Sequence, residues 1–116
     1  MIQTIDRDTL ARKLTTHPQP MLIEALPATY YLDWHLPGAR NLPHDGISAE
    51  SAAHQIPDRH AEIIVYCANT ACRNSHLAAA RLLQLGYTKV SVYAGGKQEW
   101  QAANLPVEVG MAARAA

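Results

Sequence analysis

The chain has 116 residues, of which 48% are hydrophobic and 17% charged, and ten basic and ten acidic side chains give a formal net charge of zero. This size and balance predict one packed domain and exclude a disordered or two-domain chain. Without a basic surplus we expect no nucleic-acid partner. Without a long apolar run or a signal-like start we expect no membrane partner and a cytoplasmic location.

Short helices and buried strands alternate along the chain. The sequence predicts helices over residues 6–14, 28–34, 48–55, 75–85 and 97–103. It predicts strands over residues 21–24, 39–42, 63–66 and 90–93. This alternation predicts an α/β fold, in which a central, mostly parallel sheet carries helices on both faces. We expect the domain to span residues 1–109 and residues 110–116 to form a loose tail.

The helix over 75–85 has the clearest pattern of all the predicted helices. Ser75 is expected to cap it, and Gly86 is expected to end it. The apolar stripe that should face the sheet consists of Leu77, Ala78, Leu82 and Leu85.

The two halves of the chain differ in charge. Residues 1–58 carry four basic and seven acidic side chains, whereas residues 59–116 carry six basic and three acidic ones. Between Ile63 and Gln98 there is no Asp or Glu, and both cysteines lie in this stretch. The pattern favours a site for a small anion, although a chance scatter of solvated charges would look the same.

Cys67 directly follows the strand over 63–66, and a short loop leads from it to the helix at Ser75. Ligands of parallel α/β sheets bind at the carboxyl ends of the strands. Loop amides and the helix dipole there favour a thiolate, so we expect a lowered pKa and a nucleophilic Cys67. The alternative is an inert, buried cysteine. The candidate substrate-binding loop consists of Ala68, Asn69, Thr70, Ala71, Cys72 and Arg73.

The second cysteine, Cys72, is compatible with three roles. These roles are a second reactive thiol, a resolving partner for Cys67, and an ordinary loop residue. Together with His76 the cysteines have C-x4-C and C-x3-H spacings, but no second ligand cluster follows, so no metal site is expected. Gly95-Gly96 alone does not make a phosphate-binding loop, and no cofactor is expected.

Three segments, taken in order, resemble the single-domain rhodanese-like family. They are LIE (22–24) followed by HLPGA (35–39), then IIVYC (63–67), then LGY (85–87) followed by GG (95–96) and LPV (105–107). Together they cover the chain from about Ile5 to Val107. The resemblance implies a rhodanese-like fold in which Cys67 begins the active-site loop.

The resemblance also implies a sulfurtransferase of the thiosulfate sulfurtransferase type. Cys67 would take a sulfane sulfur from thiosulfate or a persulfide donor and hold it as a persulfide. The sulfur would then pass to a thiol, a protein thiol included, or to a cyanide-like acceptor. The expected partners are therefore a small anionic sulfur donor and such an acceptor. Arg73, Arg81 and Lys97 are candidates for attracting the donor's charge.

The chain departs from the family pattern in two places. Members commonly carry an arginine after the acidic residue of the first motif, whereas here Glu24 is followed by Ala25. The cysteine loop is about two residues longer than usual, with Arg73 displaced. Glu24 is expected to orient loop amides or nearby cations, and His35 to have a structural role.

Two alternative functions remain open. The C-x5-R spacing from Cys67 to Arg73 matches phosphatases that share the rhodanese fold, although Tyr66 stands where those enzymes usually place a histidine. The other alternative is a non-catalytic or redox-sensing module in which Cys67 and Cys72 form a reversible disulfide.

Overall fold

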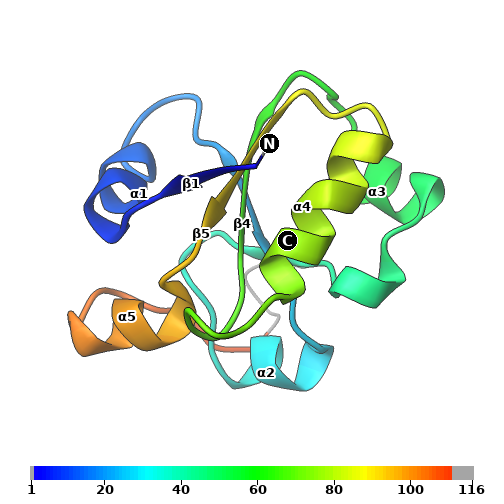
Figure 1. Cartoon of the computed structure of the whole chain (residues 1–116). Helices are drawn as coiled ribbons and strands as arrows, with labels where there is room; N and C mark the ends of the chain where they lie inside the picture. The colour runs from blue at the N-terminus through cyan, green and yellow to red at the C-terminus, as the bar shows by residue number, and fades with distance from the viewer. Residues whose placement is uncertain (1, 111–116) are drawn as a thin grey trace.

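The computed structural model describes residues 2–110, and its centre is one sheet of five parallel strands (Figure 1). The spatial order of the strands is β1-β5-β4-β2-β3. Their bounds are β1 (Gln3–Ile5), β2 (Met21–Glu24), β3 (Arg40–Asn41), β4 (Glu62–Tyr66) and β5 (Lys89–Tyr93). In the register, Tyr66 lies beside Glu24 on one side and Tyr93 on the other, so the three central strands end level.

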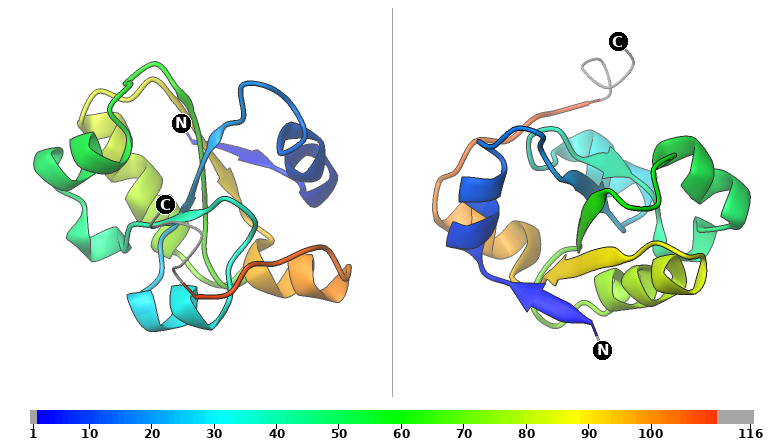
Figure 2. Two further views of the ribbon diagram at one scale, coloured as in Figure 1. Left: turned by 180° about the vertical axis from the view of Figure 1, so that it is seen from behind. Right: turned by 90° about the horizontal axis from the view of Figure 1, so that it is seen from above.

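Helices cover both faces of this sheet, as the two views in Figure 2 show. Their bounds are α1 (Arg7–Lys13), α2 (Ala28–Asp33), the 3-10 helix η1 (His44–Gly46), α3 (Ala49–Gln55), α4 (Asn74–Gln84) and α5 (Gly96–Ala102). One core lies between the sheet and α3 and α4, and the other lies between the sheet and α1, α2 and α5. The predicted α/β class with a parallel sheet and helices on both faces is confirmed.

The sequence of β4 supplies side chains to both cores. Ile63 and Val65 pack into the core beneath α3 and α4, while Ile64 and Tyr66 pack into the opposite one. Successive side chains of a strand point to opposite faces, so a central strand covered on both sides has no polar alternation. Because β4 ends at Tyr66, the next residue, Cys67, lies at the carboxyl edge of the sheet.

Several predicted details differ from the structure. The edge strand β1 was not predicted, because its three residues are mostly exposed and have no pattern of their own. Ser75 does not cap α4: Arg73 occupies the cap position and Ser75 lies buried in the first turn. Leu77, which was expected to face the sheet, is 53% exposed, whereas Ala79, which was not, is buried in the core. Of the predicted tail, residues 111–116 lie outside the described residues.

Candidate active site

Cys67 lies at the carboxyl end of β4, where the first turn of α5 holds its backbone. The Lys97 amide donates to the Cys67 carbonyl oxygen at 3.0 Å, and the Gln98 amide donates to the Ala68 carbonyl oxygen at 2.8 Å. Gly96 makes this approach possible with a φ of +65°, and a Cβ there would lie 2.5 Å from the Cys67 carbonyl oxygen. Glycine at this position therefore allows the two backbones to touch.

Cys67 is only 2% exposed as a residue, and its sulfur contacts its own loop and the start of α4. Its Sγ lies 3.4 Å from the carbonyl oxygen of Cys72 and 3.4 Å from the hydroxyl oxygen of Ser75. The sequence placed Ser75 at the helix cap, but the structure brings it beneath the candidate nucleophile. Nothing in the sequence pattern marks this contact, since it depends on how α4 packs against the end of β4.

The loop itself is stabilised by Asn69. Its Oδ1 accepts hydrogen bonds from the amides of Ala71 at 3.0 Å and of Cys72 at 3.1 Å. Loop amides were expected to turn toward the thiol, but these two bind the Asn69 side chain. Thr70, Ala71 and Arg73 are exposed, whereas Ala68, Asn69 and Cys72 are half-buried.

The expected lowering of the Cys67 pKa is wrong. Burial raises the pKa of Cys67 above its ordinary value of 9.0, because a charged thiolate loses its hydration there. The neighbouring Cys72 thiol raises the pKa further, whereas hydrogen bonds from Ser75 lower it. The resting group at neutral pH is therefore a thiol.

This raised pKa gives a prediction for the reactivity of Cys67. In a Cys72→Ala variant, which leaves Cys67 as the one thiol, burial still raises the pKa of Cys67, so alkylation should accelerate about tenfold per pH unit up to about pH 8, because only the thiolate reacts. The measurement is the iodoacetamide rate between pH 6 and 10, with denatured protein as the control. A rate that levels off below pH 8 would contradict the raised pKa.

A buried ion pair lies at the same edge of the sheet. The Lys97 ammonium donates to Oε2 of Glu24 at 3.1 Å, and both side chains are buried. The Tyr66 hydroxyl donates to Oε1 of Glu24 at 2.7 Å and accepts a hydrogen bond from the Leu36 amide. Burial raises the pKa of Glu24, while the Tyr66 hydroxyl and the Lys97 charge lower it. The pair thus joins the ends of β2 and β4 to the start of α5.

The side chains of Lys97 and Arg81 both make hydrogen bonds to other residues of the chain. Lys97 also donates to the Tyr30 carbonyl oxygen at 2.9 Å, and its ammonium lies 4.7 Å from the ring centre of Trp34. Arg81 donates to the carbonyl oxygen of Ile47. The expectation that the charge of Lys97 attracts a substrate anion is therefore not met, because Glu24 neutralises it. Glu24 does orient a nearby cation, as expected.

His35 has the structural role that the sequence suggested. Its ring stacks on Tyr31 with a centre-to-centre distance of 3.7 Å, and its Nδ1 lies 2.8 Å from the Tyr31 carbonyl oxygen. These contacts fix the turn that precedes β3. No metal cluster of three or more His, Cys, Asp or Glu side chains occurs within residues 2–110.

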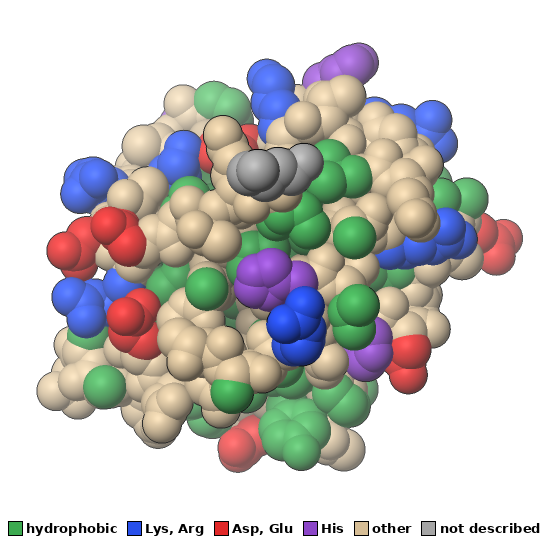
Figure 3. Space-filling model, in the orientation of Figure 1, with side chains coloured by type: hydrophobic (Ala, Val, Ile, Leu, Met, Phe, Trp, Pro, Cys, Tyr) green, Lys and Arg blue, Asp and Glu red, His purple; other side chains and the backbone are tan. Residues whose placement is uncertain are grey.

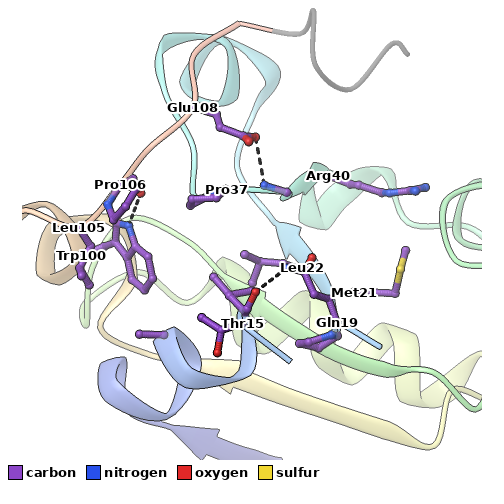
Figure 4. A pocket seen from close by; sticks show the side chains of 14 residues that line it. Thr15, Gln19, Met21, Leu22, Pro37, Arg40, Trp100, Leu105, Pro106 and Glu108 are labelled. Carbon is purple, nitrogen blue, oxygen red and sulfur yellow. Dashed lines mark hydrogen bonds between the residues drawn. The ribbon is translucent and has the colours of Figure 1, made fainter. Parts of the chain in front are cut away.

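A separate pocket of about 770 Å³ lies away from the cysteine loop. It extends between α1, the start of β2 and the segment after α5, with Trp100 and Pro106 on one side and Met21 and Arg40 on the other (Figure 4). None of the residues 67–73 lines it. This pocket is therefore separate from the loop that carries Cys67.

The molecular surface carries mixed charges on the face shown in Figure 3, where basic, acidic and hydrophobic side chains are interspersed. Within the described part of the chain, none of the helices has the length and apolar character that crossing a membrane requires.

Comparison with known proteins identifies the family. The family model described as rhodanese-like domain matches residues 6–103. Together with the parallel sheet and the cysteine at the end of β4, this match defines the class. The chain belongs to the rhodanese-like domain family.

Solved structures agree with this assignment. The chain is similar to the BH2092 protein from Bacillus halodurans, with 26% identity, a TM-score of 0.85 and coverage of 98% of this chain and 82% of the other. A rhodanese with anions from E. coli has 30% identity and a TM-score of 0.64, covering 78% and 99%. A thiosulfate sulfurtransferase from Pseudomonas aeruginosa has 25% identity and a TM-score of 0.80, covering 94% and 20%. Among curated proteins nothing matches.

Proposed function

We propose that this protein is a sulfurtransferase that carries a sulfane sulfur on Cys67. The observation that carries the proposal is the position of this thiol: Cys67 directly follows the central strand of a rhodanese-like domain, and the Ser75 hydroxyl lies 3.4 Å from its sulfur. Similarity to a thiosulfate sulfurtransferase from Pseudomonas aeruginosa supports thiosulfate as the donor.

The chemistry begins with loss of the Cys67 proton. The thiolate attacks the outer sulfur of thiosulfate, an S–S bond to Cys67 forms, and the S–S bond of the donor breaks to release sulfite. The product is a Cys67 persulfide anion. Ser75 is placed to donate a hydrogen bond to the thiolate, which offsets part of its burial. Since Cys67 is only 2% exposed, the donor has to present a narrow terminal sulfur.

The persulfide is the outcome that tests this proposal. Reduced protein incubated with thiosulfate should gain the mass of one sulfur atom, and Cys67→Ala should gain none. Cys72→Ala should still take up sulfur, because Cys67 is the group that attacks the donor. Intact-mass spectrometry after rapid removal of excess thiosulfate measures all three. No gain in any form of the protein would refute the proposal.

The phosphatase alternative is tested with an aryl phosphate and an Arg73→Ala variant. Arg73 is exposed, and its backbone carbonyl caps the first turn of α4 by accepting from the Leu77 amide. Turnover of an aryl phosphate that disappears in Arg73→Ala would favour phosphatase chemistry over sulfur transfer.

A further inference from the structure

The loop after β4 brings the two cysteines of the chain together. A tight turn closes from Asn69 to Cys72, where the Cys72 amide donates to the Asn69 carbonyl oxygen at 3.1 Å. The turn returns the chain to Cys67, so that the Cys72 carbonyl oxygen lies 3.4 Å from the Cys67 sulfur. Both cysteines are free. The Cys72 side chain is near enough to raise the pKa of Cys67, which is a second sign of their proximity.

Burial separates the two thiols in their access to other molecules. Cys67 is 2% exposed, whereas Cys72 is half-buried. In a persulfide on Cys67, the outer sulfur extends about 2 Å beyond the inner one. An external thiol would meet the outer sulfur first, whereas the inner sulfur is enclosed by the loop and has Cys72 beside it.

We propose that Cys72 is a built-in acceptor thiol that discharges the Cys67 persulfide and releases sulfide. This inference rests on the proposed function, because it requires sulfur to be loaded on Cys67. It names the acceptor that the sulfurtransferase assignment leaves open, and it gives the chain a further activity, the release of sulfide from a sulfane sulfur donor.

The Cys72 thiol loses its proton and attacks the inner sulfur of the Cys67 persulfide anion. A disulfide forms between Cys67 and Cys72, the bond between the inner and outer sulfurs breaks, and the outer sulfur leaves with the proton as hydrosulfide. The two cysteines are oxidised and the sulfane sulfur is reduced. An external dithiol then reduces the disulfide and restores both thiols.

The structure favours attack by Cys72 over attack by a thiol on another molecule. A disulfide requires Cβ atoms about 3.5–4.5 Å apart, and the main chain of Cys72 already contacts the Cys67 sulfur. A thiol held in the same loop also attacks without the entropy cost of bringing in a second molecule. We therefore expect discharge to be first order and independent of protein concentration.

The experiment follows sulfide and protein mass over time under anaerobic conditions. Reduced wild-type protein receives thiosulfate, the excess is removed, and sulfide is measured in the absence of added thiol. We expect wild type to gain one sulfur atom, then to release about one sulfide per chain and end two hydrogen atoms lighter than the reduced protein. Cys72→Ser should keep the persulfide, with sulfide release slowed at least tenfold. Wild type without thiosulfate should retain both thiols.

The two proposals fail in different ways. If wild type and Cys72→Ser take up sulfur and hold it equally long, Cys72 is not the acceptor and the sulfurtransferase assignment stands. If neither takes up sulfur, both proposals are overturned. Cys72→Ala serves as a second variant, so that a folding defect specific to the serine side chain is recognised by a difference between the two.

Discussion

Gly96→Ala is expected to destabilise the fold by about 2–5 kcal/mol and to abolish most sulfur uptake by Cys67. A left-handed backbone costs an alanine about 1–2 kcal/mol, and forcing atoms into a packed region costs about 1–3 kcal/mol more. The added Cβ would lie 2.5 Å from the Cys67 carbonyl oxygen and 2.8 Å from the carbonyl carbon of Ala68. Backbone atoms cannot rotate away, so the cysteine loop must shift.

Urea unfolding measures the stability, and the mass gain after thiosulfate measures the activity. Gly46→Ala is the matched control, because a Cβ at Gly46 meets nothing within 4 Å. It should change the free energy of unfolding by less than about 1 kcal/mol. Equal unfolding midpoints for the two variants would show that the contact between α5 and the Cys67 backbone does not matter.

Lys97→Met is expected to lower the free energy of unfolding by about 3–5 kcal/mol, because removing one partner leaves the other charge buried alone. The charge left behind is that of Glu24, whose side chain is fully buried. The double variant with Glu24→Gln should recover a large part of the loss, since it removes that charge as well. The measurement is a double-mutant cycle in urea at pH 7.

An exposed ion pair gives the control. Lys13 and Glu62 are 2.8 Å apart with side chains 35% and 39% exposed, so Lys13→Met should cost less than about 1 kcal/mol. Similar losses at Lys13 and Lys97 would mean that the buried pair has no special role in stability.

The deficit of Lys97→Met should depend on pH in a direction opposite to ordinary acid unfolding. Burial raises the pKa of Glu24 above 4.5, and loss of the lysine charge raises it further. Between the pKa of Glu24 in the unfolded chain and its raised pKa in the folded variant, the folded state binds more protons than the unfolded state. The stability of the variant therefore falls as the pH rises through this range. We expect the difference from wild type to shrink as pH is lowered toward 5, and a difference that grows would contradict this assignment.

Much of the fold follows from local sequence patterns. The short apolar runs within β2 and β4 predict strands covered on both faces, and their alternation with helices predicts a parallel sheet. The same reasoning places Cys67 at a carboxyl edge, where ligands bind. The helix predicted over residues 48–55 begins where the sequence indicates, since Ser48 caps α3 with a reciprocal hydrogen-bonded pair to Ser51.

Local patterns fail where contacts are distant in sequence. The strand β1 depends on pairing with β5 near the other end of the chain, and its three residues carry no signal alone. Ser75 is a good cap residue by type, but packing of α4 against β4 places it at the thiol instead. Leu77 fits an apolar stripe, yet it is exposed, because the face of α4 that packs on the sheet carries Ala78, Ala79 and Leu82.

The sequence by itself determined the α/β class, the order of most elements and the position of Cys67 at a strand end, because these depend on periodicity and on residues next to one another. Tertiary structure decided the ionisation of that thiol, the partnership of Glu24 with Lys97 and the nearness of Cys72 to Cys67. Each of these depends on burial and on distances between side chains. Such quantities are set only when separate segments pack together, and they decide the electrostatics of the site.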